Sequence, residues 1–242
     1  MAASFPIWTT MTLALVLGLR HALEPDHVAA VSTFSSHESN VVRSSFLGAY
    51  WGLGHTAALL VFGMAIALMR LAITPLIARD LDFVVGLMLI ALGVNVFVGM
   101  KRQGIRIHAH AHEHDGTQHT HWHVHAGGAD HEHEHRFLRA AGKPFLVGVV
   151  HGLAGTGAVM LMVVVAIPSL LIAAGYLLVF GAGVIGSMMA MSLLMSVPGA
   201  FTVGRTLAVE RVVRIAAGFF SLGFGVYLAW SVGQDLLHRL AA

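Results

Sequence analysis

The sequence contains no cysteine, so disulfide bonds, thiolate metal ligands and cysteine nucleophiles are excluded. Charged residues are also scarce: they make up 11% of the 242 residues, whereas about a quarter of a soluble domain is charged. Because 57% of the residues are hydrophobic, the chain cannot cover a surface that faces water. The composition therefore predicts that a lipid bilayer surrounds most of the protein.

Apolar runs long enough to cross a bilayer, about 20 residues each, recur along the chain. We predict an all-α, polytopic membrane protein with six spans, at 7–34, 46–71, 83–100, 145–167, 170–197 and 212–232. These spans define three parts of the chain. They are a first three-helix half at 1–100, a polar histidine-rich loop at 101–143, and a second three-helix half at 144–242.

Lysine and arginine are distributed unevenly between the two sides that six spans define. Ten lie in connections on the side of the long loop, and three lie on the other side. Since positively charged connections stay in the cytoplasm, we predict an inner (plasma) membrane protein with a cytoplasmic loop and both termini outside. This topology also explains the pI of about 9.4 without any nucleic-acid partner.

A short pattern recurs with an offset of 130 residues: Gly-x-x-His-x-Leu stands at 18–23 in the first predicted span and at 148–153 in the fourth. The same offset relates Asp80 to Glu210, and Leu92-Gly93 to Leu222-Gly223. Because each half has an odd number of spans, the two halves would run in opposite directions. Inverted repeats of this kind are common in transporters, with the substrate site near the midplane between the halves.

The strongest chemical signal is the segment His21-Ala-Leu-Glu24-Pro25-Asp26-His27, late in an apolar span. Each charged group at the centre of a bilayer costs about 2.5–3.5 kcal/mol on insertion scales, so a cluster of such groups indicates a function. Imidazole nitrogens and carboxylate oxygens together suit nickel, cobalt, zinc or manganese. The segment therefore predicts a site for a divalent transition metal.

Pro25 decides whether these side chains can share one ion. On a straight helix, His21 and Asp26 would lie about 140° apart around the axis. Pro25 has no N–H for the carbonyl of His21, and its ring pushes the preceding turn apart. A kinked or unwound turn would aim His21, Asp26 and His27 at one point. The alternative is that the segment is simply the cytoplasmic end of the helix, with its charges among the lipid headgroups.

Two further histidines stand in glycine-rich motifs inside predicted spans. His55 belongs to Trp-Gly-Leu-Gly-His-Thr at 51–56, whose glycines allow a neighbouring helix to come close. We predict that His55 is a metal ligand; the alternative is a histidine hydrogen-bonded between helices. His151 begins His-Gly-Leu-Ala-Gly at 151–155 and has no acidic residue after it. For His151, the roles of ligand, gate and packing residue are all open.

The predicted loop holds eleven of the 17 histidines, mostly as His-x-His strings among acidic residues. Such tracts bind divalent metals. We predict a segment that is disordered without metal and binds it weakly and multivalently, in a pH-dependent way because imidazole must be neutral to ligate. Storage, cytoplasmic capture and flux sensing are its open roles. The loop histidines are His108, His110, His112, His114, His119, His121, His123, His125, His131, His133 and His135.

At these residues the chain resembles the nickel/cobalt transporter superfamily. Segment 20–31 looks like the family hallmark, a His-x4-Asp-His motif within a span. The motifs at 51–56 and 151–155 are similar to those of its shorter, six-span, urease-accessory-type branch. The resemblance implies Ni²⁺ or Co²⁺ as the transported substrate, with no permanent cofactor. It implicates His21, Asp26, His27 and His55 as ligands.

Glu24 stands where the family often has aspartate, and we count Glu24 and His151 as additional candidate ligands. A histidine-rich cytoplasmic loop is more typical of the family's efflux members, and this leaves the direction of transport open.

We therefore expect a permease that imports nickel or cobalt for a nickel enzyme such as urease or hydrogenase. The alternatives are an efflux pump of the same fold and a membrane metal sensor or metallochaperone that transports nothing. Soluble metallochaperones or nickel-enzyme maturation proteins are the expected partners. An enzyme is not expected, because no serine nucleophile elbow is present.

Overall fold

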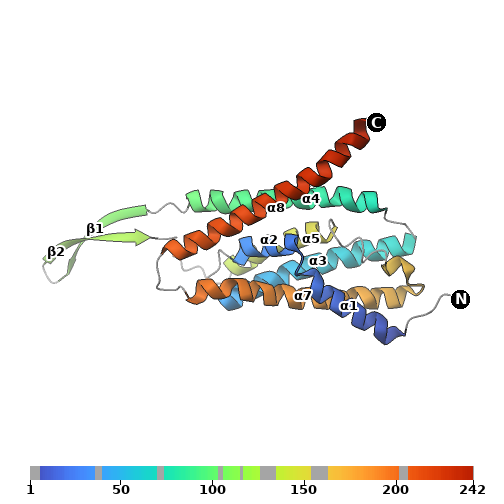
Figure 1. The fold of residues 1–242 in the computed structure, drawn as a ribbon. Coiled ribbons are helices and arrows are strands. Elements are labelled where there is room, and N and C mark those ends of the chain that lie inside the picture. Colours follow the sequence, from blue (N-terminus) through green and yellow to red (C-terminus); the bar gives the residue numbers. More distant parts are fainter. Residues whose placement is uncertain are drawn as a thin grey trace.

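The computed structural model describes residues 6–35, 40–69, 74–102, 106–114, 117–125, 135–153, 163–201 and 207–241. Apart from one hairpin, the described elements are helices (Figure 1). The helices are α1 (Ile7–His21), α2 (Pro25–Ser35), α3 (Val41–Met69), α4 (Pro75–Arg102), α5 (His135–Leu153), α7 (Leu170–Phe201) and α8 (Leu207–Ala241). The strands are β1 (Arg106–His114) and β2 (Thr117–His125).

Four helices in the described part of the chain are long and apolar enough to cross a membrane: α3, α4, α7 and α8. They correspond to four of the six predicted spans. The first predicted span is divided between α1 and α2. The fourth begins in α5, which ends at Leu153, and residues 154–162 lie outside the described residues. The total of six spans therefore stays a prediction.

The break between α1 and α2 lies where Pro25 predicts it. Helix α1 ends at His21, and Pro25 is the first residue of α2, a position where its missing N–H costs no hydrogen bond. The amide of Glu24 donates to the carbonyl of His21 at 3.1 Å, and that of Val28 donates to the carbonyl of Glu24 at 3.0 Å. The chain thus turns within three residues and keeps these backbone groups paired.

The histidine-rich segment differs from the disordered loop that the sequence predicts. Strands β1 and β2 pair antiparallel, with His108 opposite His123 and His110 opposite His121. The physical reason is that His-x-His strings alternate with a period of two residues, which is the period of a strand. The connecting dipeptide at 115–116 is Asp-Gly, a sequence typical of two-residue hairpin turns. Helix α5 also begins inside the predicted loop, at His135.

Glycines allow the helix backbones to touch around the centre of the molecule. A Cβ atom added at Gly54 of α3 would lie 2.1 Å from the carbonyl oxygen of Phe145 in α5, and one at Gly148 of α5 would lie 2.1 Å from that of Trp51 in α3. Both distances are far shorter than a van der Waals contact. Only glycine fits at these two positions, so α3 and α5 meet backbone to backbone.

We expect Gly148→Ala to destabilise the protein by about 1–3 kcal/mol, the usual cost of overpacking a well-packed interior. The added methyl group would collide with the backbone of Trp51 and push α5 away from α3. Thermal unfolding in detergent micelles measures the effect. Gly223→Ala is the matched control, since no atom lies within 4 Å of the Cβ it adds. An equal Tm for the two variants would contradict this account of the α3–α5 contact.

Helices α4 and α8 form a second close pair, with Gly86 against Gly225. Two ion pairs join them near one end, Arg79 with Asp235 and Arg239 with Asp80. These side chains are substantially exposed, so each pair contributes little stability. Figure 1 shows the hairpin projecting from one end of the helical bundle, while α8 ends at the opposite end.

Candidate metal centre

Five polar side chains from four helices meet in the interior: His21 at the end of α1, Asp26 and His27 in the first turn of α2, His55 on α3 and His151 on α5. None is more than 8% exposed, and His27 is completely buried. The structure therefore brings together the candidates that the sequence places 130 residues apart, and it buries His21, Asp26 and His27 inside the protein. Their roles as metal ligands remain a prediction.

Potential ligand atoms in this cluster fall into two groups. His21, His27 and His55 form one group, and Asp26, His27 and His151 form the other. Within each group the ligand atoms all lie within 4.8 Å of one another. His27 belongs to both groups, which makes it the common element of the centre.

The first group consists only of imidazoles. Nε2 of His21 lies 3.1 Å from Nε2 of His55. Two nitrogens that bind one ion at about 2.0–2.1 Å each are separated by about 3.0–3.4 Å in common geometries. The ring of His27 lies 4.4 Å from that of His21, measured between centroids. This arrangement suits an ion that prefers nitrogen ligands.

Asp26 connects two imidazoles in the second group. Its Oδ1 lies 3.2 Å from Nδ1 of His27, and its Oδ2 lies 2.8 Å from Nε2 of His151. When both of these nitrogens donate N–H groups to the carboxylate, Nε2 of His27 and Nδ1 of His151 carry lone pairs. Both atoms are buried and have no hydrogen-bond partner among the residues that the structure describes. Unpaired buried polar atoms are costly, and lone pairs of this kind are what a metal ion binds.

Glu24 is placed differently from the other candidates. Its carboxylate lies 3.2 Å from Nδ1 of His21 and is one-third exposed, and it belongs to neither of the two groups. Glu24 and Asp26 thus each contact the Nδ1 atom of a nearby histidine. Carboxylates in this position fix the tautomer and orientation of an imidazole and increase its basicity. The geometry favours an orienting role for Glu24.

Trp51 borders the centre, although it was not among the predicted ligands. Its buried ring stacks on that of His27, with centroids 5.6 Å apart and planes inclined by 20°, and its Nε1 has no hydrogen-bond partner. It stands four residues before His55, a spacing that places both residues on one face of α3. That spacing is the signal from which the sequence could have identified Trp51.

A half-buried acid on α4 also acts on the centre. Asp82 interacts electrostatically with Asp26, His151 and Glu24, and with Arg79 nearer the beginning of its helix. Nothing in the sequence pattern distinguishes Asp82 from an ordinary charged residue at a helix end.

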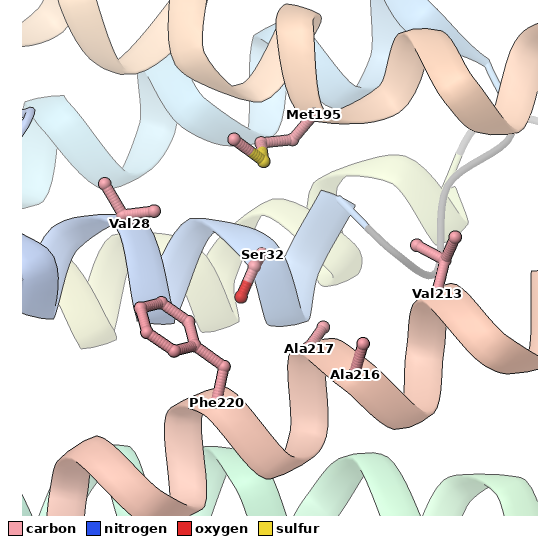
Figure 2. Close-up of a pocket in the computed structure, with 7 residues that line it drawn as sticks. All are labelled: Val28, Ser32, Met195, Val213, Ala216, Ala217 and Phe220. Carbon is pink, nitrogen blue, oxygen red and sulfur yellow. The ribbon is translucent and has the colours of Figure 1, made fainter.

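A separate apolar pocket of about 310 Å³ lies between α2, α7 and α8 (Figure 2). Val28, Ser32, Met195 and Phe220 line it, together with small residues of α8. Its one hydroxyl, on Ser32, donates to the carbonyl of Ala29 at 2.7 Å. The pocket thus lacks the imidazoles and carboxylates of the buried cluster and is distinct from it.

Two known proteins are similar to this chain. It is 33% identical over 224 residues to urease accessory protein UreH of Bacillus sp. (strain TB-90). The aligned region covers 92% of this chain and 91% of that protein. It is 27% identical over 187 residues to chloroplast protein FOR GROWTH AND FERTILITY 2 of Arabidopsis thaliana. That aligned region covers 76% of this chain and 45% of the Arabidopsis protein. No family model and no solved structure matches the chain. Because the match to UreH extends over nearly the whole of both proteins, this chain belongs to the nickel/cobalt transporter family, in its urease-accessory branch.

Proposed function

We propose that the protein carries Ni²⁺ or Co²⁺ across the cell's inner membrane by way of the buried histidine centre. The observation that carries this proposal is the convergence of five buried, potentially ligating side chains in a helical bundle, four of whose helices are long and apolar enough to cross a membrane. A cluster of histidines with a single carboxylate favours the later first-row metals over Mg²⁺ or Ca²⁺, which take oxygen ligands. The name of the similar UreH protein, a urease accessory protein, supports nickel as the cargo.

The proposed direction is import, supplying a nickel enzyme such as urease or hydrogenase. A membrane potential of about 100 mV, negative inside, favours inward movement of a doubly charged ion by about 4.6 kcal/mol, twice the value for one charge. The chain has no nucleotide-binding motif, so the ion gradient, the potential or a partner protein must supply the energy. A metallochaperone or nickel-enzyme maturation protein would receive the ion inside the cell.

An inverted repeat of two three-helix halves is part of the proposal. A Cβ atom added at Gly183 of α7 would lie 2.8 Å from the carbonyl oxygen of Leu15 in α1. A Cβ atom added at Gly54 of α3 would lie 2.1 Å from the carbonyl oxygen of Phe145 in α5. Leu15 and Phe145 are separated by 130 residues, the offset of the repeated motif, and Gly54 and Gly183 are separated by 129. Equivalent contacts between the halves support a transport site at their interface.

The hairpin is proposed as an auxiliary metal-binding element in the cytoplasm, opposite the termini. The register pairs His108 with His123, His110 with His121 and His112 with His119. Residues directly opposite each other in antiparallel strands have Cβ atoms about 4.5–5.5 Å apart, close enough for two imidazoles to share an ion. This spacing supports the proposed role of the loop histidines.

Deleting the hairpin, residues 106–125, is expected to leave transport intact at high nickel concentration and to reduce it at low concentration. The reason is that a capture element raises the local ion concentration without forming part of the buried centre. Initial rates of radioactive nickel uptake across a concentration series measure this. Loss of uptake at every concentration would instead mean that the hairpin is required for the transport step itself.

Uptake of radioactive nickel by intact cells tests the proposed function. Cells that express the protein should accumulate more nickel than cells that express His27→Ala at the same level in the membrane. Equal accumulation would reject the proposal. Lower nickel content together with greater nickel tolerance would show efflux instead. The buried histidine centre would then still carry the ion, but out of the cell.

A further inference from the structure

The division of the centre into two groups has a geometric consequence. Donors that bind one ion at about 2.0–2.1 Å cannot lie more than about 4.2 Å apart. Within each of the two groups, all ligand atoms lie within 4.8 Å of one another. No larger group among the described residues has all its ligand atoms within that distance. The five side chains as placed therefore cannot all bind one ion.

The two groups meet at one shared residue. The rings of His55 and His151 are 5.9 Å apart between centroids, and the ring of His27 lies 5.4 Å from the first and 4.0 Å from the second. His27 also has two nitrogens that face different surroundings. Its Nδ1 contacts Asp26, while its Nε2 is buried without a hydrogen-bond partner. One imidazole can thus serve both groups in turn.

The donor sets of the two groups differ in chemistry. The first offers three imidazole nitrogens, and the second offers two imidazole nitrogens and a carboxylate oxygen. The carboxylate lowers the net charge around a bound ion by one. His21 and His151, which are equivalent in the repeated motif, belong to different groups. Each group therefore contains one of the two equivalent histidines.

We propose that the centre provides two alternative positions for one metal ion, which share His27, and that the ion steps between them during transport. This rests on the proposed function. In the first position His21, His27 and His55 hold the ion, and in the second Asp26, His27 and His151 hold it. Only one ligand set is complete at a time, and His27 keeps the ion bound while the other two ligands exchange.

Three single variants of the full chain test the two positions: His55→Ala removes the first, His151→Ala the second, and His27→Ala both. The probe is Co²⁺, whose visible absorption reports its ligands, and bound Co²⁺ is measured by equilibrium dialysis of the purified protein. All variants keep the same histidine-rich hairpin, so His27→Ala gives the background that the hairpin contributes. Ser221→Ala, which removes a buried hydroxyl that donates to Leu89 at 2.9 Å, controls for general damage.

We expect His55→Ala and His151→Ala each to bind more Co²⁺ than His27→Ala does, and yet to lose transport as completely. After subtraction of the background, their absorption spectra should differ, because three-nitrogen and mixed nitrogen–oxygen ligand sets split the cobalt levels differently. If either variant binds only as much Co²⁺ as His27→Ala, the centre is a single site and the proposal is wrong. Wild-type transport by either variant would also overturn it.

Glutamine variants at the same positions replace any alanine variant that fails to fold. Failure of the proposed function has a different signature: wild-type protein that binds Co²⁺ at both positions and transports none. The binding data and the flux data therefore judge the two proposals separately.

Discussion

Replacing His27 with alanine is expected to abolish metal transport, and to remove more bound metal than any other single substitution in the centre. His27 belongs to both groups of candidate ligands, and it is completely buried. Loss of a residue that only orients a ligand costs about 10–100-fold in metal affinity or activity, so loss of a ligand shared by both groups should exceed that range. Initial rates of nickel flux into vesicles that contain the purified protein measure the effect.

Ser221→Ala is the control for this result, because it removes a buried hydrogen bond between α8 and α4 without touching the centre. Flux by His27→Ala that is comparable to flux by Ser221→Ala would mean that the ion crosses elsewhere. The apolar pocket beside α2 would then be the next region to examine, since it adjoins Val28, the residue after His27.

Asp26→Asn is expected to decrease metal affinity by about 10–100-fold. Asparagine keeps the size of the side chain but has one acceptor oxygen where aspartate has two. It can accept from His27 or from His151, not from both, and one imidazole would lose its orientation. The substitution also removes the negative charge that offsets the charge of a bound ion.

Glu24→Gln is the matched comparison for Asp26→Asn. Both substitutions replace a carboxylate that contacts Nδ1 of a histidine, but Glu24 is one-third exposed and stands outside both ligand groups. We expect a clearly smaller loss of affinity for Glu24→Gln. Equal losses in titrations of the two purified variants with Ni²⁺ would show that Asp26 only orients its neighbours and does not bind the ion.

The parts of the fold that follow from local chemistry could be predicted from the sequence. The lack of an N–H on Pro25 indicated the break between α1 and α2, and the cost of burying charge indicated that Asp26 and His27 serve a common purpose. Both effects act within a few residues, so no knowledge of tertiary structure was required. Four of the predicted spans were equally clear, because length and hydropathy alone determine them.

The parts that depend on contacts between distant segments could not be predicted in this way. His151 of α5 contacts Asp26 of α2, and the sequence does not state which helices pair. The stacking of Trp51 on His27 likewise depends on how α2 and α3 pack, which local sequence does not determine. The hairpin was missed because polar composition was taken to mean disorder, although the two-residue alternation of its histidines is also the pattern of a strand.

We propose that the buried ligands of this protein serve to pass a cation from one side of the bilayer to the other. The most direct test is nickel flux into vesicles that contain only the purified protein, under an imposed potential that is negative inside. We expect the wild-type protein to accumulate nickel inside the vesicles in a saturable way, and the His27→Ala variant to accumulate none. Saturable binding of nickel by the wild-type protein with no accumulation inside the vesicles would contradict it, and would identify the centre as a metal sensor or store.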